Sequence, residues 1–271
     1  MGFRIREVSI PVLPPKSPSL RVLHFSDIHL APYQEKSLNF IRTWRNLNPD
    51  LVISTGDHIA SARSIPLLSD ALGPLLEKPG FYVFGSNDYF GPKFKNPLRY
   101  LLSDRGKRIH GNPLPWKDLD SSLGQSGWIN LTHKIIQTKV NGVSIELRGT
   151  DDAHLQLDDY KRVKQIRGRV DLSVGVTHAP YARVLSEMSS DQLDLVFSGH
   201  THGGQIRLPW FGGTRSLATN CDLPNWRSRG VTKLPREPWL HVSAGMGHNP
   251  LTPFRFLSPR EASIINLESH S

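Results

Sequence analysis

The chain has 271 residues, which suits one large α/β domain or two small ones, and 38% of them are hydrophobic, an ordinary value for a globular protein. Its formal net charge of +9 is unusually high and indicates an anionic partner: a phosphorylated substrate, a nucleic acid or an acidic lipid surface. The single cysteine, Cys221, excludes an internal disulfide and any multi-cysteine zinc module.

Membrane insertion is not predicted from the sequence. No apolar run approaches the ~20 residues that a membrane-spanning helix needs. The first twenty residues combine charged residues with prolines and lack the apolar core of a signal peptide. We therefore expect a cytoplasmic protein or one that touches a membrane peripherally, with the removal of an upstream anchor as the alternative.

Strands and helices alternate in the first third of the chain. Strands are expected over residues 3–12 (at a sheet edge), 21–26, 50–55 and 81–84. Helices are expected over residues 37–48, closed by Pro49, and over 66–76. The last three of these strands each run directly into a polar cluster. Alternating strands and helices predict a parallel sheet covered on both faces, with the polar clusters gathered at its carboxyl edge.

Residues 90–132 break this alternation because they are rich in proline and glycine. Their basic residues include Lys93, Lys95, Arg99, Arg105, Lys107 and Arg108. We interpret the segment as a basic insertion or cap with one short helix over 97–102, inside a single domain of residues 1–271. A solvated surface and a substrate-binding lid remain equal alternatives for it.

The remainder of the chain returns to strands and helices. A hairpin is predicted around Asn141-Gly142, a strong turn pair. Helices are expected over residues 158–167 and 181–190, and strands over 172–176, 193–197, 239–243 and 263–267. Polar groups again follow the strands: the segments 149–152, 177–178 and 198–205.

Seven side chains at the ends of strands form a constellation with metal-binding chemistry. They are Asp27, His29, Asp57, Asn87, His178, His200 and His202. Oxygen and imidazole ligands together suit two divalent ions that share a bridging carboxylate. Two cations ~3.5–4 Å apart can clamp the attacking and leaving oxygens of a phosphate ester. Taken singly, each residue has a structural alternative, such as a helix cap for Asp27 or a core histidine for His178.

The motifs that carry these residues resemble those of the calcineurin-like metallophosphoesterase family, in the same order and over most of the chain. They are Asp27-Ile28-His29, Gly56-Asp57-His58, Gly85-Ser86-Asn87-Asp88, Thr177-His178 and Gly199-His200-Thr201-His202. The resemblance implies an α/β fold, a four-layered α/β/β/α sandwich with the site at the carboxyl ends of the strands. It implies that Asp27, His29 and His202 hold one ion, that Asn87, His178 and His200 hold the other, and that Asp57 bridges them. The ions would be Mn²⁺, with Fe, Zn or Mg as alternatives.

One motif departs from the family pattern, which places Gly-Asn-His-Asp/Glu where this chain has Gly85-Ser86-Asn87-Asp88. Without a gap, Asn87 replaces a histidine that helps to protonate the leaving group, and an amide cannot act as a general acid. A slip of one residue instead lets Asn87 bind metal and brings Asp88 near the place of the histidine. We favour Asn87 as the ligand, and Asn87 and Asp88 are the catalytic candidates.

Within the family, the segment 200–209 looks like a bacterial branch that includes UDP-2,3-diacylglucosamine pyrophosphatases and other lipid-directed phosphodiesterases. The expected function is therefore a dinuclear-metal phosphohydrolase, in which metal-bound hydroxide cleaves a phosphodiester or pyrophosphate bond. Its substrate would be phosphorylated and anionic. A further expectation is that this substrate is lipid-linked and that the protein contacts an anionic membrane peripherally. Trp116, Trp210 and Trp226 are interpreted as exposed side chains that could serve such a substrate.

Two alternatives stay open. A nuclease or cyclic-nucleotide phosphodiesterase fits the charge, but the sequence lacks the basic stripe interleaved with aromatics that single-strand binders use. A non-catalytic metal-binding scaffold would fit the altered third motif. No obligate protein partner is evident. Further candidates for the site are Asp151, Asp152 and His154, with a polar turn as the alternative, and Arg207 and Arg255, for which a surface position is the simpler interpretation.

Overall fold

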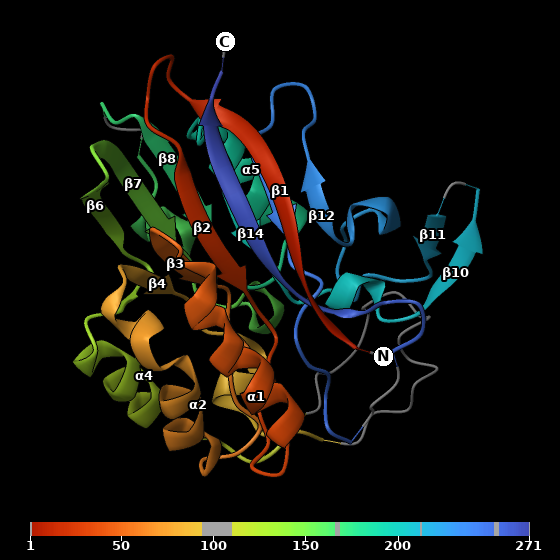
Figure 1. Cartoon of the computed structure of the whole chain (residues 1–271). Coiled ribbons are helices and arrows are strands. Elements are labelled where there is room, and N and C mark those ends of the chain that lie inside the picture. Colours follow the sequence, from red (N-terminus) through yellow and green to blue (C-terminus); the bar gives the residue numbers. More distant parts are fainter. Residues whose placement is uncertain (1, 94–109, 166–168, 212, 252–254, 271) are drawn as a thin grey trace.

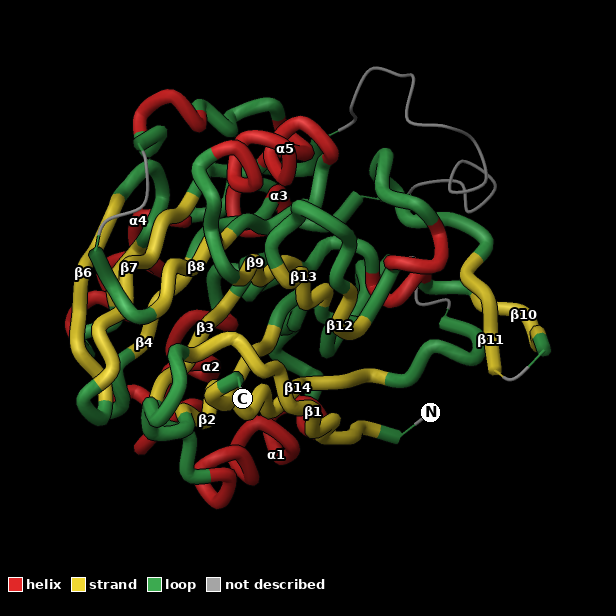
Figure 2. The backbone as a smooth tube through the Cα atoms, turned by 90° about the horizontal axis from the view of Figure 1, so that it is seen from above, coloured by secondary structure: helices red, strands yellow, loops and turns green. Residues whose placement is uncertain are grey.

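The computed structural model describes residues 2–93, 110–165, 169–211, 213–251 and 255–270, and within them two six-stranded sheets pack face to face (Figures 1 and 2). The first sheet has the order β1 (Phe3–Leu13), β14 (Arg260–Ser269), β2 (Leu20–Phe25), β3 (Leu51–Ser54), β4 (Gly80–Tyr82) and β5 (Ile129–Asn130). The second has the order β12 (Gly230–Thr232), β13 (Trp239–Val242), β9 (Leu195–Ser198), β8 (Leu172–Val176), β7 (Val143–Gly149) and β6 (Ile135–Val140).

Both sheets are mixed rather than wholly parallel. Strands β2 to β5 run parallel to one another, but β14 pairs antiparallel with β2. In the second sheet β7, β8, β9 and β13 are parallel, whereas β6 and β12 join antiparallel at the two edges. The expectation of one parallel sheet is thus wrong in detail, because a hairpin and the C-terminal strand supply antiparallel neighbours. The predicted edge position of the first strand is confirmed by β1.

Three hydrophobic clusters separate four layers, which confirms the α/β/β/α sandwich. The helices are α1 (Glu35–Thr43), α2 (Ser64–Leu72), α3 (Ser86–Tyr89), α4 (Trp116–Gln125) and α5 (Ala182–Ser190). One cluster lies between the first sheet and α1, α2 and α4, and includes Leu38, Leu68 and Leu119. A second fills the space between the sheets, and a third packs α5 against the second sheet through Val184 and Met188. Figure 1 shows α1, α2 and α4 together on one side of the first sheet.

The helices of the first half follow the predicted apolar spacing but are shorter. In α1, Leu38 and Ile41 are buried at a spacing of three residues, and the chain continues as a 3₁₀ turn before Asn48 adopts a left-handed φ of 44°. The predicted helix over 66–76 is two elements, since α2 ends where Gly73 takes a φ of 46° and a 3₁₀ turn follows.

The range 90–132 contains elements that the sequence did not predict. Helix α4 contacts α2 and covers the first sheet, and β5 pairs in parallel with β4. The helix expected over 97–102 lies outside the described residues. Trp116, expected to be exposed, packs against Phe84 and Tyr89 with ring centroids 5.8 and 5.6 Å apart.

Two predictions for the second half have opposite outcomes. The hairpin is confirmed, since Asn141 and Gly142 both take positive φ values, 48° and 89°, between β6 and β7. The predicted α-helix over 158–167 is wrong, because the described part of this range holds only a 3₁₀ turn over 160–162.

No helix among the described residues is long and apolar enough to cross a lipid bilayer.

Candidate metal centre

The seven predicted ligands come from one edge of each sheet. Asp27 and His29 follow β2, Asp57 follows β3, and Asn87 lies in α3, just after β4. From the second sheet, His178 follows β8, and the His200–His202 segment follows β9. Because β2, β3 and β4 are parallel neighbours, as are β8 and β9, the strands deliver these groups to a common edge.

Five of the groups meet at short distances. The Nε2 atom of His29 lies 3.4 Å from Oδ2 of Asp57 and 3.3 Å from Nε2 of His202. The Nε2 atom of His202 lies 3.6 Å from Oδ1 of Asp27, and that of His178 lies 3.5 Å from Oδ2 of Asp57. The ligand atoms of Asp27, His29 and His202 all lie within 4.8 Å of one another, as do those of Asp27, Asp57 and His178. Asp57 therefore faces histidines from both sheets.

The remaining two predicted ligands contact this group. The Nδ1 atom of His200 lies 3.3 Å from Nε2 of His178. Asn87 donates its amide Nδ2–H to Oδ2 of Asp57 at 2.6 Å and its backbone N–H to Oδ1 of the same carboxylate at 2.8 Å. The amide of Asn87 therefore meets Asp57, whereas the Ser86 hydroxyl accepts a 3.3 Å hydrogen bond from that amide.

Backbone carbonyl groups fix the orientation of three of the imidazoles. The pairs are His178 Nδ1 with Thr55 O at 2.6 Å, His200 Nε2 with Asn220 O at 3.1 Å and His202 Nδ1 with Gly247 O at 3.2 Å. A carbonyl oxygen only accepts hydrogen bonds, so each of these ring nitrogens donates. In a neutral imidazole the other nitrogen then carries a lone pair. All three of these second nitrogens point toward the neighbouring ligands, as in metal sites where an outer partner orients the histidine.

The donor set fits divalent cations. Oδ2 of Asp27 accepts a 2.9 Å hydrogen bond from the His200 backbone N–H, but Oδ1 of Asp27 is buried and has no hydrogen-bond partner. A buried carboxylate oxygen without a partner is costly. Imidazole lone pairs and carboxylate oxygens that converge on one place are satisfied together by a metal ion, and nitrogen and oxygen ligands suit ions such as Mn²⁺, Fe²⁺ and Zn²⁺.

The backbone at this site is strained. Left-handed φ values occur at Asp27 (52°), His29 (46°), Asp57 (57°), His200 (69°) and His202 (49°). Such conformations cost on the order of 1–3 kcal/mol each for non-glycine residues and persist where the surrounding structure enforces them. Gly85 is required for another reason, since a Cβ atom there would overlap Oδ1 of Asp57 and the ring of His178.

Burial and neighbouring charges shift the pKa values of Asp57 and His178 in opposite directions. Burial raises the pKa of Asp57, but the adjacent histidines, His178 first, hold it well below its usual range. Burial lowers the pKa of His178, yet Asp57 and Asp27 raise it to about 9. For His200 and His202 burial prevails and the pKa lies well below the ordinary value. The buried carboxylate of Asp57 thus supplies a negative charge that attracts cations, while the imidazoles of His200 and His202 stay neutral.

Asp88 lies in a network of hydrogen bonds from backbone N–H groups. It is fully buried, and its Oδ2 accepts hydrogen bonds from the backbone N–H groups of Asp57 at 2.8 Å and Gly85 at 3.0 Å. Its Oδ1 accepts from the N–H of His58 at 2.7 Å, whose ring Nδ1 lies 3.1 Å from Oδ2. These contacts tie Asp88 to the loop that carries Asp57, and its role as a proton donor stays a prediction.

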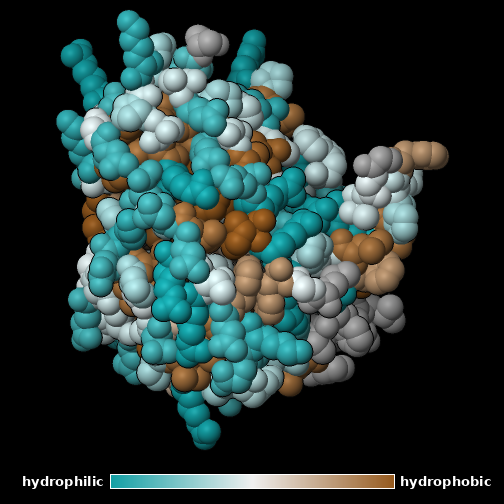
Figure 3. All heavy atoms as spheres, viewed as in Figure 1, coloured by the Kyte–Doolittle hydropathy of each residue, from teal (hydrophilic) through white to brown (hydrophobic). Residues whose placement is uncertain are grey.

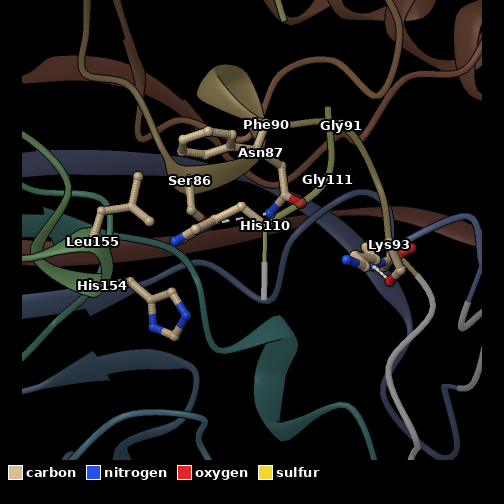
Figure 4. A pocket seen from close by; sticks show the side chains of 10 residues that line it. Ser86, Asn87, Phe90, Gly91, Lys93, His110, Gly111, His154 and Leu155 are labelled. Carbon is tan, nitrogen blue, oxygen red and sulfur yellow. Dashed lines mark hydrogen bonds between the residues drawn. The ribbon is translucent and has the colours of Figure 1, made fainter. Parts of the chain in front are cut away.

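A pocket adjoins the centre on the side of Asn87 (Figure 4). Its lining includes Ser86, Asn87, Lys93, His110, His154 and Asn249. The ring of His154 lies 4.5 Å from that of His200, centroid to centroid, so the pocket opens beside the predicted ligands. Of the other two candidates, Asp151 accepts a hydrogen bond from the Tyr89 hydroxyl at 2.7 Å, and burial raises the pKa of Asp152 to about 7. Neither of these two lines the pocket.

The two predicted surface arginines are both largely buried. Arg207 donates to the backbone oxygen of Gly203 at 2.8 Å, and Arg255 donates to those of Gly247 at 2.8 Å and His202 at 3.2 Å. Both guanidinium groups therefore brace the loops that carry the histidines. Sequence alone did not indicate this role, because it does not show which carbonyl groups the loops turn toward each guanidinium.

The comparisons with known proteins agree with this geometry. A family model described as calcineurin-like phosphoesterase matches residues 20–204. The metallophosphoesterase YkuE of Bacillus subtilis (strain 168) is 26% identical over 92% of this chain and 79% of its own length. The phosphodiesterase YaeI of Escherichia coli (strain K12) is 26% identical over 71% of this chain and 64% of its own. A bovine transmembrane protein with a metallophosphoesterase domain is 26% identical over 98% of this chain, which spans 57% of that protein.

Proposed function

The chain belongs to the calcineurin-like phosphoesterase family, a metal-dependent class of phosphoester hydrolases, and on that premise we propose that it cleaves a phosphodiester or pyrophosphate bond with two divalent cations. The observation that carries the proposal is the orientation of the ligands. Three imidazoles donate to backbone carbonyls and turn their second nitrogens toward neighbouring ligands. That of His202 lies 3.6 Å from Oδ1 of Asp27, a buried oxygen without a hydrogen-bond partner, and that of His178 lies 3.5 Å from Oδ2 of Asp57 and 3.3 Å from Nδ1 of His200.

The contacts support the proposed ligand sets. Asp27, His29 and His202 would hold one cation, Asn87, His178 and His200 the other, and Asp57, which faces both groups, would lie between them. Two bound divalent cations supply charge that stabilises the attacking and leaving oxygens of a displacement at phosphorus. We propose Mn²⁺ as the ion, with Fe, Zn or Mg as alternatives.

The pocket next to the centre supplies the contacts with the substrate. Lys93 and His110 come from the predicted basic cap and line this pocket, which supports the lid interpretation over a solvated surface. The amide of Asn87 can donate a hydrogen bond to a phosphate oxygen but cannot protonate a leaving group. We therefore propose a leaving group that needs little protonation, such as the phosphate released from a pyrophosphate.

The finer part of the proposal concerns the substrate class. The net charge of +9 supports an anionic substrate, and we propose a lipid-linked one that is reached by peripheral contact with an anionic membrane. The similarity to YaeI, a phosphodiesterase, supports a diester over a monoester. Nuclease activity is the weaker alternative and a non-catalytic scaffold the weakest.

The test is hydrolysis of bis-p-nitrophenyl phosphate and p-nitrophenyl phosphate by metal-stripped protein to which Mn²⁺, Mg²⁺, Zn²⁺ or Fe²⁺ is restored. We expect turnover with Mn²⁺, faster for the diester, and losses of at least a hundredfold in His200→Ala and Asn87→Ala. His270→Ala, an exposed histidine outside the site, is the matched control. Bound metal without turnover of either ester, of a pyrophosphate or of an oligonucleotide would leave only the scaffold.

A further inference from the structure

A β-hairpin projects from the body of the protein directly after the metal centre. It consists of β10 (Arg207–Trp210) and β11 (Gly213–Ser216), and we call the described residues 206–211 and 213–217 the arm. Figures 1 and 2 show from two directions that the arm stands away from both sheets. Its strands pair with each other and with neither of the six-stranded sheets.

The arm exposes large hydrophobic side chains to an unusual extent. The exposed fractions are 45% for Leu208, 56% for Trp210 and 96% for Phe211, which lies at the tip. Trp226 and Phe256, the latter bridged to Ile206 at the base of the arm, are 59% and 52% exposed. Figure 3 shows hydrophobic side chains on this projecting part. Contiguous exposed apolar surface of this kind marks an interaction site.

The two faces of the hairpin differ. Leu208 and Trp210 share one face because side chains alternate along a strand, and Arg215 pairs with Leu208 on that face. On the opposite face Arg207 is buried and donates to Gly203 O at 2.8 Å and to the Ser228 hydroxyl at 2.9 Å. The inner face thus fixes the arm to the histidine loop, whereas the outer face leaves Leu208 and Trp210 about half exposed.

The charge around the hydrophobic face is strongly positive. Residues 205–236 contain six arginines and lysines and a single acidic residue, Asp222. The guanidinium of Arg215 lies 5.1 Å from the centre of the Trp210 ring. Tryptophan favours the boundary between headgroups and acyl chains, and basic residues next to it are attracted by anionic lipids. A protein partner would need an acidic and apolar surface in one place, whereas an anionic bilayer always presents both.

We propose that the arm docks on the surface of an anionic lipid membrane, with Trp210 and Phe211 entering the headgroup boundary and Arg215 pairing with lipid phosphates. The docked arm lies next to the metal centre. It begins shortly after His202, and Asn220, just beyond its end, accepts the hydrogen bond from the His200 ring. Docking would therefore bring the mouth of the site to the lipid surface. The arm would thus make the membrane contact on which the proposed function rests. Its binding to vesicles can be measured independently of hydrolysis.

The experiment is co-sedimentation of the full chain with vesicles of phosphatidylcholine alone and of phosphatidylcholine mixed with phosphatidylglycerol. We expect binding to the anionic vesicles that weakens as salt is raised. The double variant Trp210→Ala/Phe211→Ala should bind at least tenfold more weakly, and Arg215→Glu should lose binding several-fold. Tyr33→Ser, which removes an exposed aromatic side chain outside the arm, should bind like the wild type.

Two results would overturn the proposal: wild-type protein that stays in solution with both kinds of vesicle, or a double variant that sediments as the wild type does. A dimer in light scattering that the double variant abolishes, without vesicle binding by the wild type, would assign the arm to a second copy instead. Unchanged hydrolysis of bis-p-nitrophenyl phosphate by the double variant shows that it is folded. Vesicle binding by a protein that hydrolyses nothing would contradict the catalytic proposal and leave this one intact.

Discussion

Replacing Asp88 by asparagine separates a positioning role from proton donation. The carboxylate is fully buried and takes hydrogen bonds on both oxygens, from the N–H groups of Asp57 and Gly85 on Oδ2 and of His58 on Oδ1. Asparagine has nearly the same shape, but its NH₂ group must replace one of these oxygens. Whichever orientation the amide takes, an N–H group faces buried N–H donors.

The size of the effect follows from those contacts. If the amide oxygen takes the place of Oδ2, the bonds from Asp57 and Gly85 remain and the bond from His58 is lost. In the other orientation only the bond from His58 remains. A hydrogen bond to a charged acceptor contributes about 1.5–3 kcal/mol, so losing one or two lowers the free energy of unfolding by about 2–6 kcal/mol. For a chain of this length the unfolding temperature should fall by roughly 4–12 °C.

The assay is thermal and urea unfolding of Asp88→Asn beside Asp70→Asn, whose exposed carboxylate pairs with Arg42 and should contribute at most about 1 kcal/mol. Turnover of bis-p-nitrophenyl phosphate is measured across pH at a temperature where both variants are folded. We expect Asp88→Asn to lose stability and to keep the shape of its pH profile. Unchanged stability together with a lost basic limb of the profile would refute the positioning role and restore Asp88 as the acid.

Three further predictions concern the site and the core. Gly85→Ala should abolish Mn²⁺ binding in calorimetry, because its Cβ would overlap Oδ1 of Asp57, whereas Gly124→Ala, which meets nothing within 4 Å, should bind normally. Chelation should lower the unfolding temperature, and Mn²⁺ at ~100 times its dissociation constant should restore about 2.7 kcal/mol of stability; an unchanged unfolding temperature would speak against a bound ion. Burial between the sheets lowers the pKa of His24 well below its ordinary value of 6.5 and lowers the pKa of His241 to about 3. Both rings therefore stay neutral in the folded protein, whereas the unfolded chain takes up protons on them below about pH 6.5. Stability should therefore be complete above about pH 6.5 and fall as the pH drops toward 3, and His24→Leu/His241→Leu should flatten that dependence of the unfolding temperature on pH.

The parts of the fold that were predictable are those fixed by local pattern. Residues 21–26, 50–55 and 172–176 are short segments rich in Val, Leu, Ile and Phe that are followed by polar groups, and each contains a central, buried strand. Since parallel strands deliver their carboxyl ends to one edge, the order of the motifs was enough to group the predicted ligands. The pairing of β14 between β1 and β2 joins opposite ends of the chain, and no local pattern encodes it.

The errors share a cause in tertiary contacts. The range 158–167 has helical spacing, but the Asp191 carboxylate accepts hydrogen bonds from the Tyr160 hydroxyl at 3.0 Å and the Gln165 N–H at 3.0 Å. The Gln165 N–H is thereby withdrawn from a helical bond. In the site, the hydrogen bonds of Asp88 come from three N–H groups in two loops, which a sequence displays only as separate motifs.

The left-handed backbone at five of the seven predicted ligands restricts which residues those positions accept. Glycine, asparagine, aspartate and histidine adopt a φ near +50° more readily than β-branched and bulky residues do. The backbone conformation alone thus favours a small set of residue types at these positions, and two of them, aspartate and histidine, also bind metal well. In a chain no longer selected for catalysis, the backbone conformation would still restrict substitutions at these positions, so its sequence would continue to resemble that of a metal site.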